Sequence, residues 1–334
     1  MHKVELYLII IVSEHVHNVI IFYITEGDIM KKNNLIYSTA ILALSTLLLS
    51  ACSTTAKKSS SSDSKPKVSK VEKKKAPKQI AGGKLQDGVY KLVEDNYFNG
   101  YKVKVSMTVK GGKVTDTSYD NVDKNGKSKA KDTKYEAQMK KYSQAKIGPK
   151  EYIPKLQKSF AASGANSSAI QVVTGATSSS NTLKNYVNQL TQAAQKGDTA
   201  TIHINNNKKM KDGTYKLAEK NYSHGYRQVL TMVIKKGKIS DFTYDQVNKK
   251  GVSKTKNAAY EKQMKKVNKV GPKEYIPKLQ KEFIKAKGNT EKVQAVSGAT
   301  ESSHSFIAYA EQLINAAQKG KSGTIKVDNI VYQE

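Results

Sequence analysis

The sequence of 334 residues has one cysteine, no tryptophan and only one arginine, Arg227. A single cysteine, Cys52, can build neither a disulfide nor a thiolate metal site within the chain. The positive charge is therefore carried by lysine, and it is large, with a net charge of +29. Because no arginine and aromatic cluster and no zinc-finger spacing accompanies it, we expect no nucleic-acid partner. A basic surface also suits anionic lipid headgroups or wall polymers.

The N-terminal part has the pattern of a processed segment. A basic start at Met30 is followed by an apolar run, residues 35–49, and by small residues before Cys52. This order is typical of a lipoprotein signal peptide over residues 30–51, and cleavage before Cys52 would free its thiol for a diacylglycerol anchor. The alternative is a transmembrane helix, for which the run is short. Residues 1–29 precede this start, and we interpret them as an upstream extension.

Residues 52–86 are rich in lysine and serine and contain two prolines. Such a segment cannot bury enough apolar surface to fold. We therefore predict a flexible tether between the lipidated cysteine and the rest of the chain.

From Asp87 onward the chain is duplicated. The first copy is residues 87–205, a linker covers 206–211, and the second copy is residues 212–334. Three stretches recur in the same order: Asp87-Gly88-Val89-Tyr90 as Asp212-Gly213-Thr214-Tyr215, Tyr119-Asp120 as Tyr244-Asp245, and 148–157 as 271–280. A repeat of this length indicates two tandem domains and not a solenoid of short units.

Each copy contains strand patterns first and helix patterns afterwards. Residues 101–119 alternate with period two on either side of Gly111-Gly112, which predicts a β-hairpin, and the second copy repeats this pattern. Two helical stretches follow, near 134–145 and 150–162, and a short strand at 201–204 closes the copy. This order predicts an α+β fold, with an antiparallel sheet and packed helices in each domain.

Catalytic motifs are missing from the repeated unit. His224 and His304 of the second copy correspond to Asn99 and Asn181 of the first, which excludes a duplicated histidine-dependent site. The G-x-S-x-G, H-E-x-x-H and phosphate-loop motifs do not occur. A shared aspartate, Asp120 in the first copy, is expected to be a turn or cap group. We therefore expect no self-sufficient hydrolase.

One short turn occurs once in each copy and precedes a helix pattern. It reads Thr174-Gly175-Ala176-Thr177 in the first copy and Ser297-Gly298-Ala299-Thr300 in the second. We expect Thr177 and Thr300 at helix N-termini, where free backbone N–H groups and the positive end of the helix dipole suit a phosphate. The alternative is that both are ordinary N-cap residues. Each threonine follows two small residues, Gly and Ala, and each turn carries a second hydroxyl, on Thr174 or Ser297. Both features favour a binding role over simple capping.

These turns resemble the D-x-x-[ST]-G-A-T-x-[ST] motif of the FMN-binding domain family. The resemblance implies two FMN groups, each joined by a phosphoester to Thr177 or Thr300. The remaining motif residues implied in cofactor binding are Thr174, Gly175, Ala176, Ser297, Gly298 and Ala299. The resemblance also implies a Mg-dependent flavin transferase as partner, with FAD as donor. The sequence departs from the family at Gln171 and Gln294, where the family usually has Asp.

The tandem arrangement behind a lipoprotein signal is similar to the two-flavin surface lipoproteins of Gram-positive extracellular electron transfer. It implies an electron carrier, not an enzyme that acts alone, anchored through Cys52 in the bilayer on the extracellular face of the cell membrane. The implied donor is a membrane quinol-linked reductase, and the implied acceptors are external, such as ferric iron. Two other hypotheses remain open: a cell-wall or solute-binding lipoprotein without flavin, and a flavin reductase with its own substrate pocket.

Overall fold

The computed structural model divides the chain into two units, Met1–Lys73 and Lys74–Glu334. It describes residues 7–11, 20–24, 78–142 and 145–333. The predicted signal peptide, Cys52 and most of the predicted tether lie outside these residues. The first unit contributes one antiparallel pair, β1 (Tyr7–Ile11) with β2 (Ile20–Ile24). Among the described residues, no helix combines the length and the apolar character that a membrane span requires.

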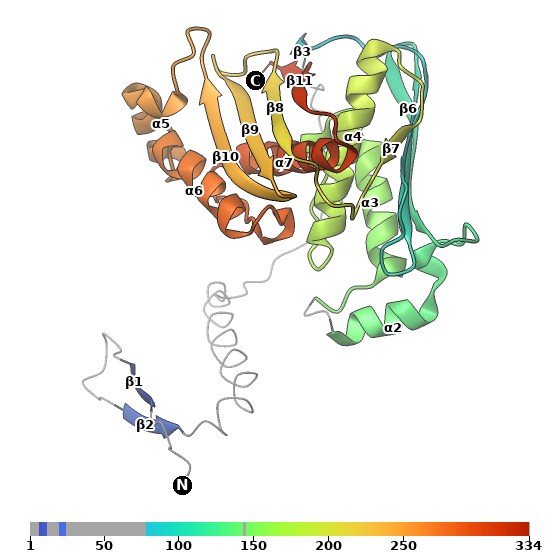
Figure 1. The fold of residues 1–334 in the computed structure, drawn as a ribbon, viewed down its shortest axis with the longest axis horizontal. Helices are drawn as coiled ribbons and strands as arrows, with labels where there is room; N and C mark the ends of the chain where they lie inside the picture. The colour runs from blue at the N-terminus through green and yellow to red at the C-terminus, as the bar shows by residue number, and fades with distance from the viewer. Residues whose placement is uncertain (1–6, 12–19, 25–77, 143–144, 334) are drawn as a thin grey trace, which may run out of the picture. The chain divides into compact units, whose positions relative to one another are not determined.

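The first domain of the second unit is a four-stranded sheet with helices packed on it (Figure 1). Its strands, in spatial order, are β6 (Lys113–Val122), β5 (Lys102–Lys110), β4 (Gly88–Glu94) and β7 (Ile202–Ile204). Its helices are η1 (Lys129–Lys131), α2 (Thr133–Tyr142), α3 (Pro149–Ser163), η2 (Ser167–Ala169) and α4 (Thr177–Lys196). Side chains along β5 alternate between buried and more exposed, so one face of the sheet carries the core against α3 and α4.

The second domain repeats this order. Its strands, in spatial order, are β10 (Lys238–Val247), β9 (Arg227–Lys235), β8 (Gly213–Glu219) and β11 (Gly323–Val327). Its helices are η3 (Lys254–Lys256), α5 (Ala258–Asn268), α6 (Pro272–Lys285), η4 (Thr290–Lys292) and α7 (Thr300–Lys319). The predicted hairpins and the α+β class are confirmed in both domains. The sheets are mixed, however, because β7 and β11 pair in parallel with β4 and β8, each after a long helix.

The recurring Asp-Gly-x-Tyr stretch fixes each hairpin turn. The Asp87 carboxylate accepts hydrogen bonds of 2.9 Å from the backbone N–H groups of Gly111 and Gly112. These bonds hold the pKa of Asp87 below its usual range. Asp212 does the same for the turn at residues 236–237. Three residues further on, Tyr90 is fully buried and forms part of the core.

Each domain has its own hydrophobic core, and the two cores are built from corresponding residues. The largest fully buried side chains include the pairs Tyr90 and Tyr215, Tyr152 and Tyr275, and Phe160 and Phe283. The domains meet where α4 packs against α7. The contact is lined with amides, because Asn315 Oδ1 accepts from Asn185 Nδ2 at 2.9 Å and from Gln189 Nε2 at 3.2 Å.

The end of the segment predicted as a tether is a strand. β3 (Gln79–Ala81) pairs antiparallel with β12 (Val331–Tyr332), the last strand of the second domain. The turn after β3 is also held, because the Gly83 N–H donates to Asp328 Oδ2 at 3.2 Å. The composition of residues 52–86 favours disorder, but these last residues pair with a strand from the other end of the unit.

Candidate ligand-binding site

The predicted turns stand at the starts of the two long helices. α4 begins at Thr177 and α7 begins at Thr300, as expected from the sequence. The N-cap positions are occupied by Ala176 and Ala299, which make no side-chain cap hydrogen bond. The threonines are therefore the first helical residues and not N-caps, so the capping interpretation is wrong.

The turn holds its threonine outward by burying its alanine. Ala176 and Ala299 are each 5% exposed and pack into the cores, whereas Thr177 and Thr300 are exposed. The residues Thr174, Ser297, Gln171 and Gln294 are exposed as well. Each turn therefore presents hydroxyl groups to solvent beside the N–H groups of a helix start.

The glycines allow the backbone of each turn to take this conformation. Gly175 and Gly298 have φ angles of 81° and 78°, a conformation that residues with a Cβ rarely adopt. A Cβ on Gly298 would also lie 2.2 Å from the carbonyl oxygen of Asn268. A side chain at this position would force the turn away from the end of α5.

A buried serine in each domain ties the turn to its helix. Ser180 Oγ accepts from the Val173 N–H at 3.0 Å and donates to the Ala176 carbonyl at 2.8 Å. Ser303 makes the same two bonds in the second domain, to Val296 and Ala299. The motif does not include these serines, although both stand three residues after the motif threonine.

A cavity lies beside each helix start. The cavity of the first domain has a volume of about 460 Å³ and includes Ser178 and Ser179 of the first turn of α4. The cavity of the second domain has a volume of about 290 Å³ and includes Thr300 itself. Residues 288–291 of the second domain border the first cavity, and residues 165–168 of the first domain border the second. Each cavity is therefore completed by the other domain.

Two tyrosines and a lysine line each cavity at corresponding positions. In the first domain Tyr101 and Tyr135 meet edge to face with ring centroids 5.8 Å apart, and Lys129 Nζ lies 3.9 Å from the Tyr135 centroid. In the second domain Tyr226 and Tyr260 are 6.2 Å apart, and Lys254 Nζ lies 4.3 Å from the Tyr260 centroid. Aromatic rings of this kind suit a planar ligand, and the lysine suits an electron-rich one.

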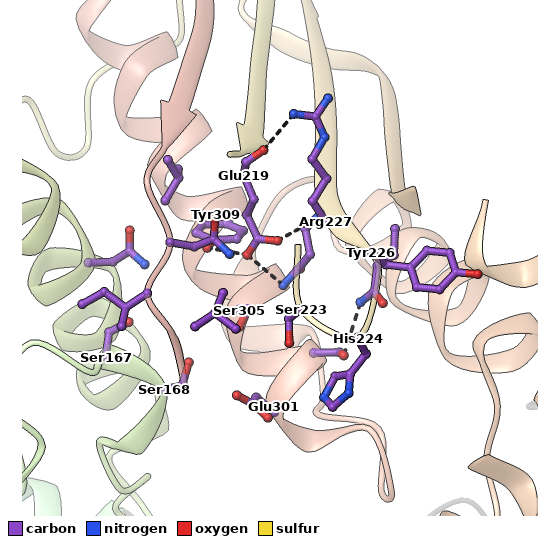
Figure 2. A pocket seen from close by; sticks show the side chains of 18 of the residues that line it. Ser167, Ser168, Glu219, Ser223, His224, Tyr226, Arg227, Glu301, Ser305 and Tyr309 are labelled. Atoms are coloured by element: carbon purple, nitrogen blue, oxygen red, sulfur yellow. Dashed lines mark hydrogen bonds between the residues drawn. The ribbon is translucent and has the colours of Figure 1, made fainter. Parts of the chain in front are cut away.

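A buried carboxylate also borders each cavity. Figure 2 shows Glu219 of the second domain, which accepts from Tyr309 Oη at 2.8 Å and from the backbone N–H of Gln228 at 2.7 Å. Burial raises the pKa of Glu219 to about 7. Glu94 accepts the corresponding bonds in the first domain, and burial raises its pKa as well.

A third cavity, of about 860 Å³, lies between the domains and is bordered by both Thr177 and Thr300. His304 also borders it, and burial lowers the pKa of this histidine to about 4. Beside Thr177, the Ser178 hydroxyl donates to the Glu291 carboxylate of the other domain. The two motif threonines therefore face a common space.

The remaining polar candidates have structural roles. Asp120 Oδ1 accepts from Ser128 Oγ at 2.8 Å, which ties β6 to the start of η1. No group of three or more His, Cys, Asp or Glu side chains that could hold a metal ion occurs within the described ranges. The sequence analysis did not single out Lys129, Glu94 or Tyr135 and their counterparts, although each recurs at the same position of both copies.

The chain is similar to several known proteins. The family model for the FMN-binding domain matches residues 99–192 and again residues 224–315. The "15 kDa lipoprotein" of Treponema pallidum (strain Nichols) is 30% identical over 115 residues, which are 34% of this chain and 81% of that protein. The crystal structure of the CPE2226 protein from Clostridium perfringens, 30% identical, covers 35% of this chain and 98% of that chain, with a TM-score of 0.32.

Both matches to the family model contain the turn, the helix start and most of the cavity residues of their domain. Together they span more than half of the chain. The chain therefore belongs to the FMN-binding domain family and carries two copies of that domain in tandem.

Proposed function

We propose that the protein is a membrane-anchored electron carrier that holds one FMN in each domain through a phosphoester to Thr177 or Thr300. The observation that carries this proposal is the repeated helix start, where a Gly-Ala turn exposes a threonine hydroxyl beside a cavity lined by tyrosine and lysine. A phosphate on either hydroxyl would lie next to unpaired N–H groups and the positive end of the helix dipole.

The residues around each cavity fit the other end of FMN. The tyrosine pairs offer apolar surface to a planar ring, and Lys129 and Lys254 offer positive charge. In the first domain the buried Asn121 Oδ1 has no hydrogen-bond partner among the residues that the structure describes, so it is available to a ligand N–H. When bound, FMN supplies redox chemistry in one-electron or two-electron steps.

Anchorage through Cys52 would hold both domains at the outer face of the membrane, as in a lipoprotein of a Gram-positive bacterium. The similarity to a protein named as a lipoprotein supports this part of the proposal. Electrons would then pass from a quinol-linked reductase in the membrane to external acceptors such as ferric iron. A cofactor that accepts one or two electrons suits a position between these partners.

The test is the intact mass of the protein after coexpression with a Mg-dependent flavin transferase and a supply of FAD. We expect the mass of two added FMN groups and in-gel flavin fluorescence, with peptide mapping to Thr177 and Thr300. Thr177→Val with Thr300→Val should remove all covalent flavin. The matched control, Thr177→Ser with Thr300→Ser, keeps both hydroxyls and should retain flavin.

Two outcomes would contradict the proposal. An unmodified mass for the unaltered protein would show that Gln171 and Gln294 are incompatible with attachment, and would favour a solute-binding or cell-wall lipoprotein. Covalent flavin that persists in the double valine variant would place the attachment elsewhere. Turnover of NADH by the purified protein alone would instead favour a flavin reductase.

A further inference from the structure

The two cavities differ in one buried amide at corresponding positions, Asn121 and Gln246. In the second domain Gln246 Oε1 accepts from Lys254 Nζ at 3.0 Å and from Tyr275 Oη at 2.8 Å. Its Nε2 donates to Tyr244 Oη at 2.9 Å and to Ser302 Oγ at 3.3 Å. The glutamine amide is thus fully occupied by protein groups.

The first domain has the shorter asparagine, and the corresponding bonds do not form. Asn121 is 8% exposed, and its Oδ1 is buried without a hydrogen-bond partner in the part of the chain that the structure describes. A buried acceptor without a partner is unfavourable unless a ligand or water supplies a donor. Asn121 is one of the residues that border the cavity.

The shorter asparagine also leaves the lysine of the first domain without an amide partner. Lys129 is 8% exposed, and its ammonium faces the Tyr135 ring instead of an amide oxygen. Lys254 has the same place in the second domain, but it donates to Gln246. The described residues of the first cavity therefore offer one unused acceptor and one unused cationic donor.

An acceptor and a cationic donor that border the same cavity can complement an imide edge, in which an N–H group lies between two carbonyl groups. The isoalloxazine ring of a flavin has such an edge. We propose that the first domain, and not the second, recognises this edge, with Asn121 Oδ1 accepting from the imide N–H and Lys129 donating to a neighbouring carbonyl. This inference rests on the cavity being the flavin site of the proposed function, but it does not require covalent attachment.

Free ring analogues test the proposal on the protein produced without a flavin transferase. Lumiflavin has the imide N–H, and 3-methyllumiflavin carries a methyl group in its place. We expect the unaltered protein to bind lumiflavin at least tenfold more tightly than the methylated analogue, as measured by fluorescence titration.

Two exchanges assign this preference to one cavity. Asn121→Gln should abolish it, because the longer side chain can engage Lys129 and Tyr152 as Gln246 engages Lys254 and Tyr275. Gln246→Asn is the converse exchange: it frees Lys254 in the second cavity and should add a preference there without removing that of the first domain. Lys129→Met is a second variant that should weaken lumiflavin binding, should Asn121→Gln fail to fold.

Three results would overturn the inference: equal affinity for the two analogues, a preference that survives in both Asn121→Gln and Lys129→Met, or no lumiflavin binding at all. These readouts are separate from the mass measurement. A protein without covalent flavin can still show the preference, and a protein with two covalent flavins can lack it.

On the flavinylated protein the same exchanges have a second readout. Reduction adds negative charge to the ring, and an ammonium freed from an amide oxygen favours the reduced form. In a variant that carries flavin only in the first domain, Thr300→Val, Asn121→Gln should therefore lower the midpoint potential. In the converse variant, Thr177→Val, Gln246→Asn should raise it.

Discussion

The two cavities share the residues that give them their shape and differ in the residues that form hydrogen bonds inside them. The tyrosine pair, the lysine and the buried glutamate recur in both domains. At other positions the first cavity has Phe98, Val103 and Asn121, where the second has Ser223, Gln228 and Gln246. At these three positions the first cavity is thus more apolar and has an unpaired acceptor, whereas in the second both glutamines hydrogen-bond to Tyr244 Oη.

This difference shows how a duplicated domain can keep the shape of its cavity and change the hydrogen bonds inside it. Gln228 illustrates the point, because its backbone N–H donates to Glu219 and its side-chain Oε1 accepts from Tyr244 Oη at 3.3 Å. Val103 keeps the backbone bond to Glu94 but has no side-chain polar group. At this position the backbone makes the shared bond, and the difference lies in the side chain.

The largest expected effect is the pH dependence that arises from Glu94 and Glu219, the buried glutamates at corresponding positions of the two cavities. The pKa of Glu219 is raised from 4.5 to about 7, so the folded protein holds this proton more tightly than the unfolded chain. Its contribution to the free energy of unfolding is therefore full below pH 4.5 and falls as the pH rises to about 7. The fall amounts to about 3 kcal/mol, since one pKa unit corresponds to about 1.4 kcal/mol.

Glu219→Gln should remove this part of the pH dependence, as measured by urea denaturation at a series of pH values. The free energies of unfolding of Glu219→Gln and of the unaltered protein should also differ by a constant amount, because the substitution alters the hydrogen bonds. Glu94→Gln is the comparison in the first domain, where the pKa is raised in the same direction. Curves for Glu219→Gln and the unaltered protein that run parallel from pH 4 to 8 would contradict the burial of an acid at this site.

A smaller effect should separate the two lysines. Lys254→Met removes a hydrogen bond between an ammonium and a buried amide, which should lower the free energy of unfolding by about 2 kcal/mol. Lys129→Met removes only the contact with aromatic rings, and about 1 kcal/mol or less is expected. Both losses in the free energy of unfolding are measured by denaturation of the variants at neutral pH. Equal losses would mean that the amide network of the second cavity adds nothing.

The smallest effect concerns the surface that the domains share. Asn315→Ala removes the acceptor for Asn185 and Gln189, and a loss of about 1 kcal/mol in the free energy of unfolding is expected. The loss should be accompanied by a broader transition, because the two domains would unfold less cooperatively. Lys321→Ala, an exposed change outside this contact, is the control. A sharp and unshifted transition for Asn315→Ala would contradict a role of this amide in coupling the domains.

Much of the fold follows from local patterns in the sequence. Alternation around Gly111-Gly112 predicts the hairpin, and the apolar spacing after Thr177 predicts a helix that begins where α4 does. The parallel pairing of β7 with β4 was not predicted, because three residues carry too little pattern to reveal their neighbour. The same holds for β3, whose partner is about 250 residues away in the sequence.

The site was less accessible to sequence reasoning than the fold. The motif located the turn, but the cavity is assembled from β-strands, a 3₁₀ turn and the other domain, which no local pattern connects. Asn121 and Gln246 differ by one methylene group, and that difference gains meaning only when the bond from Lys254 to Gln246 and the unpartnered Asn121 Oδ1 are seen in the structure. Among nineteen tyrosines, the sequence could not show which ones border the cavity.

The pairing of β3 with β12 has a mechanical consequence. A pull on the chain from its N-terminal side reaches β3 before it reaches either sheet, and β3 is held by the last strand of the second domain. The load is thereby shared with the far end of the folded unit instead of falling on the first domain alone. The β3–β12 pair is short, so such a pull would act on it before it acts on either four-stranded sheet.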